Sequence, residues 1–240
     1  MREIKMSIER TQVLVWSRKI RLFHWINVIT VLLLVISGFL IYKNRLFGFS
    51  TDGKVLLIII HVVVGYVFTI NLLFRIVIGF IGKTYERWNQ TLPFNKGFKM
   101  ELKEFCQHKP IVYKGHNPAG KLMVLALLTL MTVQMITGLL IAGTDIYYPP
   151  FGNYFAENIA IDKSNLEIIK PFSKENVDNE AFEAMIAFRV PFIYTHYYIF
   201  YGLLFLISLH IAGAIIAERK ERSGLISSMF SGYKYLPKDK

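Results

Sequence analysis

Cysteine is almost absent from this chain, which has 240 residues and a single thiol, that of Cys106. One cysteine cannot form an internal disulfide, and it cannot supply the thiolates of an iron–sulfur cluster held by this chain alone. The sequence also lacks the C-x-x-C-H motif to which haem c is covalently attached. We therefore interpret Cys106 as an inert thiol, and any redox group must be held by other side chains.

Charged residues are scarce in four long stretches, at about 22–42, 55–81, 121–142 and 192–217. At 1.5 Å per helical residue, each stretch is long enough to cross the ~30 Å hydrocarbon core of a bilayer. The whole chain is 53% hydrophobic, which excludes an ordinary soluble domain. The sequence predicts an all-α integral membrane four-helix bundle, built as a single domain over 1–240 without an internal repeat.

Acidic residues are in the minority, with 17 Asp and Glu against 28 Lys and Arg. The basic residues gather before the first apolar stretch, between the second and third, and after the fourth. The segment at about 143–191 instead has an acidic excess. Because cytoplasmic loops are rich in Lys and Arg, we expect both termini in the cytoplasm and this outer segment on the other side. Residues 1–21 do not resemble a cleavable signal, so we expect the first helix to be retained.

The distribution of charge also bears on possible partners. Binding of nucleic acid needs a basic face or stripe on a soluble fold, and none is visible, so we expect membrane lipid and no nucleic acid as partners. The outer segment begins with the aromatic, proline-containing run GTDIYYPPFGNYF. This run is compatible with docking of an external partner and equally with an aromatic cap at the membrane interface.

Four histidines lie in the apolar stretches: His24, His61, His196 and His210. His196 and His210 are 14 residues apart, close to the ~14.4 residues of four helical turns, so they share a helix face at a separation of roughly 21 Å. With the expected topology, His24 lies level with His210 near the cytoplasmic side. His61 lies level with His196 near the outer side. The spacing therefore predicts two depth-matched pairs, His24/His210 and His61/His196.

Each pair offers two neutral imidazoles, and no nearby Cys, Asp or Glu completes a four-ligand zinc site. Two imidazoles do complete an iron atom that already has four porphyrin nitrogens, and such saturated iron favours electron transfer over oxygen binding. We predict two haem b groups with these four histidines as the axial iron ligands. A proton relay is the alternative for histidines in a membrane, but it does not explain the spacing.

Arg75 lies inside the cytoplasmic half of the second stretch, where a buried arginine is a candidate functional residue. Its guanidinium could pair with a propionate of the cytoplasmic haem or extend to the interface, and the sequence leaves both open. Small residues such as Gly38 and Gly65 fit either a haem or a neighbouring helix. His108 and His116 lie between the second and third stretches without a depth-matched partner, and we expect both to be solvated.

The segment RLFHWINVITVLLLVISG, with Arg21, His24 and Trp25 followed by Ser37 and Gly38, resembles the first-helix signature of the b-type cytochrome subunits of nickel–iron hydrogenases. HNPAGK before the third stretch and SSMFSGYK near the C-terminus are similar to that family as well. The two histidines of the fourth stretch resemble its paired ligands, although Tyr197 stands where the family usually has a basic residue. The same four-helix dihaem core resembles the cytochrome subunits of formate dehydrogenase-N and of some thiosulfate reductases.

The resemblance implies a membrane-anchoring electron-transfer subunit in the prokaryotic inner membrane, rather than a stand-alone enzyme. Such a subunit passes electrons between periplasmic iron–sulfur and catalytic oxidoreductase subunits, hydrogenase-like in kind, and the membrane quinone pool. Two other functions remain to be weighed: a haem-free anchor that only docks a partner, and a proton-relay transporter. The four intact histidines argue against the first, and the lack of broken helices or repeat symmetry argues against the second.

Overall fold

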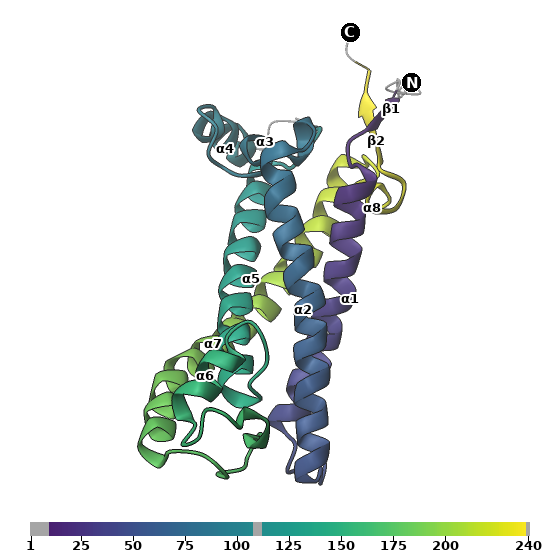
Figure 1. The fold of residues 1–240 in the computed structure, drawn as a ribbon. Helices are drawn as coiled ribbons and strands as arrows, with labels where there is room; N and C mark the ends of the chain where they lie inside the picture. The colour runs from purple at the N-terminus through teal and green to yellow at the C-terminus, as the bar shows by residue number, and fades with distance from the viewer. Residues whose placement is uncertain (1–9, 108–111, 239–240) are drawn as a thin grey trace, which may run out of the picture. The chain divides into compact units, whose positions relative to one another are not determined.

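The computed structural model describes residues 10–107 and 112–238. Its long helices are α1 (Arg18–Tyr42), α2 (Thr51–Ile81), α5 (Pro118–Asp145) and α7 (Asn179–Glu221) (Figure 1). Each of the four contains an apolar window long enough to cross a membrane. The predicted all-α membrane architecture with four spanning helices is confirmed within the described residues. The side of the membrane on which the termini lie stays a prediction.

The helices begin earlier than their hydrophobicity indicates, and the difference is largest for α7. This helix begins at Asn179 rather than near 192, and it continues through Pro191. The carboxylate of Asp178 accepts a hydrogen bond of 2.8 Å from the backbone N–H of Ala181, which caps the first turn. Hydropathy reports the part of a helix that lies in lipid, so it cannot detect a helical extension made of polar and mixed residues.

Shorter elements connect the long helices. They are β1 (Arg10–Leu14), η1 (Thr84–Glu86), α3 (Trp88–Thr91), α4 (Phe98–Cys106), α6 (Gly152–Ile159), η2 (Leu166–Ile168), α8 (Ser228–Ser231) and β2 (Tyr233–Pro237). The two strands pair antiparallel, with Arg10 opposite Pro237 and Leu14 opposite Tyr233 (Figure 1). The segments before α1 and after α7 therefore lie on the same side of the protein.

The chain divides into two compact units that cut across the long helices. The first unit contains Met1–Trp25, Leu73–Leu128 and Leu204–Lys240, and the second contains Ile26–Leu72 and Thr129–Leu203. Each unit holds one end of every long helix. His24 and His210 belong to the first unit, and His61 and His196 belong to the second.

The first unit is organised around a small apolar cluster and one buried lysine. Val15, Trp16, Ile20 and Ile78 form the cluster. The side chain of Lys234 is 1% exposed, and its ammonium donates to the carbonyl oxygens of Tyr113 at 3.3 Å and Gly115 at 3.0 Å. Burial lowers the pKa of Lys234, while the carboxylates of Glu221 and Glu218 act in the opposite direction. This lysine joins β2 to the loop that leads into α5.

The outer segment of the second unit has an apolar core of its own. Its buried members are Ala156, Ile159, Ile169, Val177 and Met185, so that α6 packs against the first turns of α7 (Figure 1). Arg189 forms an ion pair of 2.9 Å with Asp145, and the hydroxyl of Tyr66 on α2 donates to the carbonyl of Pro149 at 2.6 Å. The segment is thus a folded cap tied to the helix ends.

Replacing Lys234 by methionine should destabilise the protein by about 2 kcal/mol, because two part-buried carbonyl oxygens lose their donor. Chemical unfolding in detergent, followed by circular dichroism, measures the change. Lys114 is exposed in the same loop, and Lys114→Met is the matched control, with an expected effect within about 0.5 kcal/mol. Equal stability of the two variants would contradict the structural role given to Lys234.

Candidate functional site

In the second unit, His61 on α2 and His196 on α7 are near enough to interact electrostatically. Each ring is within hydrogen-bond distance of a hydroxyl group on a neighbouring helix. Nδ1 of His61 lies 2.9 Å from Oγ of Ser37 on α1, and Nδ1 of His196 lies 2.9 Å from Oγ1 of Thr137 on α5. The two histidines are therefore held in the same way, each with Nδ1 engaged.

A glycine follows each of these hydroxyl residues and lies against the same ring. A Cβ atom at Gly38 would be 3.3 Å from Cε1 of His61, and one at Gly138 would be 3.1 Å from Cε1 of His196. Both distances are tighter than ordinary van der Waals contact. The missing side chains therefore let each imidazole lie close to the backbone of the neighbouring helix.

Sequence reasoning did not single out Thr137 or Gly138, although a signal for both was present. The hexapeptide ISGFLI begins at Ile36, and the closely similar ITGLLI begins at Ile136. The expectation of no internal repeat overlooked this recurrence because it is much shorter than a structural repeat. A hydroxyl residue followed by glycine, repeated in two apolar helices, is the pattern that marks both histidine supports.

In the first unit, His24 on α1 and His210 on α7 are near enough to interact electrostatically. The ring of His24 stands edge-on to that of Trp25, with ring centroids 5.3 Å apart. Within the described chain, Nδ1 of His24 is buried and has no hydrogen-bond partner. Leaving a buried polar atom unpaired costs roughly 1–3 kcal/mol, so this nitrogen differs from the Nδ1 atoms of His61 and His196, which have hydroxyl partners.

Arg75 on α2 is 5% exposed, so its guanidinium packs inside the first unit rather than extending to solvent. It lies over the ring of Trp88 at 4.2 Å and reaches Oγ1 of Thr91 at 3.5 Å. The carboxylate of Glu86 attracts the positive charge of the Arg75 guanidinium. Among the described atoms, Nη1 of Arg75 is buried without a hydrogen-bond partner. A buried donor of this kind is suited to an anionic group such as a carboxylate.

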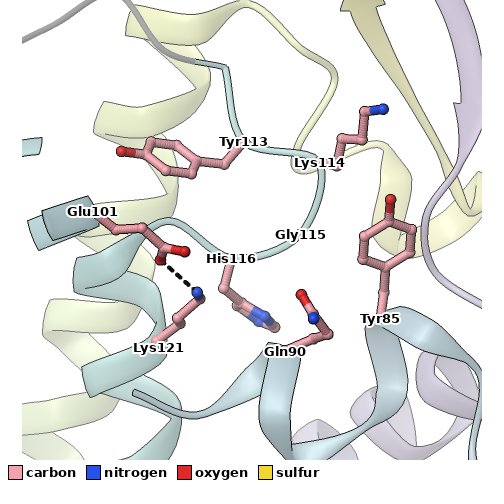
Figure 2. Close-up of a pocket in the computed structure, with 8 residues that line it drawn as sticks. All are labelled: Tyr85, Gln90, Glu101, Tyr113, Lys114, Gly115, His116 and Lys121. Carbon is pink, nitrogen blue, oxygen red and sulfur yellow. Dashed lines mark hydrogen bonds and ion pairs between the residues drawn. The ribbon is translucent and has the colours of Figure 1, made fainter. Parts of the chain in front are cut away.

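A cavity of about 190 Å³ opens in the first unit before α5. Its lining residues are Tyr85, Gln90, Glu101, Tyr113, Lys114, Gly115, His116 and Lys121. Figure 2 shows the side chains of His116 and Gln90 directed toward each other, with Tyr85 beside Gln90. Glu101 and Lys121 form an ion pair of 2.6 Å at one wall (Figure 2).

His116 is part-buried, and the expectation that it is solvated is wrong. The centroids of its ring and of the Trp16 ring are 4.9 Å apart. The ring also interacts electrostatically with Lys234, Arg75, His210 and Lys121. Burial, with these neighbours, lowers the pKa of His116 to about 3, so the ring is neutral near pH 7. His108 lies outside the described residues.

The donor set fits haem iron better than a bare metal ion. Among the described residues, no group of three or more His, Cys, Asp or Glu side chains could hold a metal ion. The chain offers imidazoles in pairs, which do not complete a zinc site but do complete the axial positions of haem iron. Paired imidazoles in the apolar helices of a polytopic membrane protein are typical of haem-binding proteins.

The family assignment agrees with this class. The family model described as prokaryotic cytochrome b561 matches residues 15–232, and the chain belongs to that family. The protein is therefore a multi-pass membrane cytochrome of the b type, with an electron-transfer role and haem b as its cofactor. The resemblance stated from the sequence is confirmed. The assignment of the four histidines as axial ligands stays a prediction.

The relatives carry one recurring name. A "Probable Ni/Fe-hydrogenase B-type cytochrome subunit" of Rhizobium leguminosarum bv. viciae is 27% identical over 94% of this chain and 90% of its own length. A protein of that name from Bradyrhizobium diazoefficiens is 26% identical over 94% of this chain and 87% of its own. The corresponding hydrogenase 1 subunit of Escherichia coli K12 is 25% identical over 58% and 64%. No solved structure matches the chain significantly.

The support of Arg75 depends on a glycine of α2. A Cβ atom at Gly79 would lie 1.8 Å from Cε2 of Trp88, so Gly79→Ala must displace the ring on which Arg75 rests. We expect this substitution to destabilise the protein by about 2 kcal/mol, as overpacking does. In a Trp88→Leu background the clash disappears, and alanine should then be neutral or stabilising because it favours the helix.

Unfolding free energies of the two single variants and the double variant in detergent give the coupling between the sites. A cost of Gly79→Ala that is the same in both backgrounds would show that the contact with Trp88 is not the reason for the glycine.

Proposed function

We propose that this protein is a dihaem b-type cytochrome that anchors an outer-side oxidoreductase and passes electrons between it and the membrane quinone pool. The observation that carries the proposal is the presence of two imidazole pairs, each brought together within its own compact unit. One haem site explains only one pair. The names of the relatives support a hydrogenase as the catalytic partner.

In this proposal His24 and His210 hold one haem b, and His61 and His196 hold the other. Bound haem b supplies reversible one-electron chemistry at iron, and the protein provides ligands, orientation and exclusion of water. The loop charges indicate that the His24/His210 pair lies on the cytoplasmic side. The His61/His196 pair then faces the periplasmic partner, which would contain the iron–sulfur and catalytic subunits.

We also propose that the cavity beside His116 is where quinone exchanges electrons. It lies in the same unit as His24 and His210, and His116 feels the charge of His210. Its wall combines two tyrosine rings with the Glu101–Lys121 ion pair, which suits a flat ring with polar oxygens. Protons taken up there come from the cytoplasmic side, so transfer from an outer donor would be electrogenic.

A haem-free anchor is the second candidate, and the folded outer segment is the observation that favours it. Phe151, Tyr154, Ile161 and Phe172 of this segment are 39%, 64%, 71% and 53% exposed, which suits a docking surface. Docking alone, however, gives no reason for placing paired imidazoles in apolar helices. The anchor role is therefore better understood as one part of the cytochrome function.

His210→Ala should remove the haem of the first unit and leave the other, and His196→Ala should do the reverse. The physical reason is that each alanine deletes one of only two axial ligands. A dithionite-reduced minus oxidised spectrum with a pyridine haemochrome count measures the haem per chain. Wild type should hold two haems and each variant about one, with different remaining midpoint potentials.

His116→Ala is the matched control, because His116 is a histidine of the first unit that we do not assign as a ligand. It should retain both haems. Two haems in either ligand variant would refute the ligand assignment, and a folded wild-type protein without haem would leave only the anchor function.

Arg75→Gln should lower the midpoint potential of the haem held by His24 and His210. Removal of a buried positive charge stabilises the oxidised form, which is the more positive one. The measurement is best made in a His196→Ala background, where that haem alone should remain. Arg75→Lys, which keeps the charge, should restore most of the potential. An unchanged potential in Arg75→Gln would show that the guanidinium does not face the haem.

A further inference from the structure

We propose that Ser37 and Thr137 are positioning residues that fix the tautomer and ring plane of His61 and His196, and so lower the potential of the haem these histidines hold. This inference rests on the proposed dihaem function. It assigns a role to two hydroxyls that the ligand set alone leaves unexplained.

The hydroxyl of Ser37 has a single proton to donate. The hydroxyl lies 2.7 Å from the carbonyl oxygen of Leu33, one helical turn earlier, and 2.9 Å from Nδ1 of His61. A carbonyl oxygen can only accept, so the single hydroxyl proton goes to Leu33. The hydroxyl oxygen must then accept from His61, which means that Nδ1 of His61 carries the ring proton.

The same holds for Thr137 on α5. Its hydroxyl donates to the carbonyl of Val133 at 2.8 Å and lies 2.9 Å from Nδ1 of His196. The ring of His196 is also hydrogen-bonded to the backbone of Gln134. If the partner there is the carbonyl, it too can only accept, which again makes the imidazole the donor. Two helices thus present the same arrangement to two histidines.

The consequence for iron binding follows from the tautomer. A neutral imidazole has one protonated and one unprotonated nitrogen, so protonation at Nδ1 leaves the lone pair on Nε2 for the metal. Donation of the Nδ1 proton to an acceptor makes the ligand more basic. A more basic ligand stabilises ferric iron over ferrous iron, which lowers the midpoint potential.

In the other pair, at least one histidine has no such hydrogen bond at Nδ1. In the described part of the chain, Nδ1 of His24 is buried and unpartnered. The ligand basicity of His24 is therefore not raised in the same way. Hydrogen bonding thus places the potential of the His61/His196 haem below that of the His24/His210 haem. Electrons that enter from the outer side then move toward the higher potential.

Each hydroxyl works together with the glycine that follows it. Because Gly38 and Gly138 have no Cβ, the imidazole edge can approach the helix closely enough for Nδ1 to reach the hydroxyl. The ring is then held between a backbone surface and a hydrogen bond, which restricts rotation about its long axis. A neutral acceptor does this without adding a charge inside the membrane.

The test uses Ser37→Ala, Thr137→Val and the double variant, each in the full-length protein purified with haem in detergent. Potentiometric titration of the haem spectrum gives both midpoint potentials, and electron paramagnetic resonance reports the orientation of the axial rings. We expect the potential of the His61/His196 haem to rise and its resonance to shift, while the other haem stays unchanged as an internal reference. Thr137→Val should have the smaller effect, because Gln134 remains as a partner.

Matched controls come from the same two helices. The hydroxyls of Thr30 on α1 and Thr144 on α5 donate to carbonyls one turn earlier, and in the described chain neither is hydrogen-bonded to a histidine. Thr30→Val and Thr144→Val should leave both potentials unchanged. Ser37→Thr and Thr137→Ser keep the hydroxyl and should also behave as wild type. Loss of the outer haem from the alanine and valine variants, with retention in these conservative ones, would equally support the role of the hydroxyl.

The proposal is overturned if Ser37→Ala and the double variant retain two haems with unchanged potentials and resonances. It is also overturned if the threonine controls shift the potential as much. The proposed dihaem function is contradicted by a different result, namely the retention of both haems in His61→Ala. The two failures are therefore distinguishable in one series of variants.

Discussion

The interior of a bilayer offers no water to a polar side chain, so each imidazole placed there needs a partner inside the protein or on a bound group. His61 and His196 are each hydrogen-bonded to a hydroxyl through Nδ1. Nδ1 of His24 has no hydrogen-bond partner in the described residues. Haem iron is the group that we propose for the two pairs, which lie on α1, α2 and α7.

The way in which the rings are held follows from the same constraint. A carboxylate would fix a histidine more strongly, but it would add a charge that the membrane disfavours. Ser37 and Thr137 avoid the charge, and their own protons are occupied by the carbonyls of Leu33 and Val133. Each hydroxyl oxygen is therefore an uncharged acceptor for the Nδ1 proton of its histidine. The following glycine removes the Cβ that would otherwise hold the ring away.

The sequence predicted the features that depend on pattern alone. Apolar length predicted the four spanning helices. The spacing of His196 and His210 with the charge of the loops predicted two histidine pairs, and the members of each pair are near enough to interact electrostatically, while their role as haem ligands stays a prediction. It did not predict the start of α7 at Asn179, because a polar helical extension has no hydropathy signal. It also missed the burial of His116, which depends on the ring of Trp16, a residue distant in the chain. Thr137 was missed because the recurrence of ISGFLI as ITGLLI is too short to stand out as a structural repeat.

Two features of different origin both widen the difference in midpoint potential between the two proposed haems. In the first unit, the cations Arg75, Lys121 and Lys234 act on His116, whose ring also feels His210, and positive charge favours the reduced form of a nearby haem. In the second unit, hydroxyl acceptors raise the basicity of the ligands and favour the oxidised form. One effect is electrostatic and the other acts through the iron–nitrogen bond, so they are independent. Together they would make the transfer of an electron from the His61/His196 haem to the His24/His210 haem favourable.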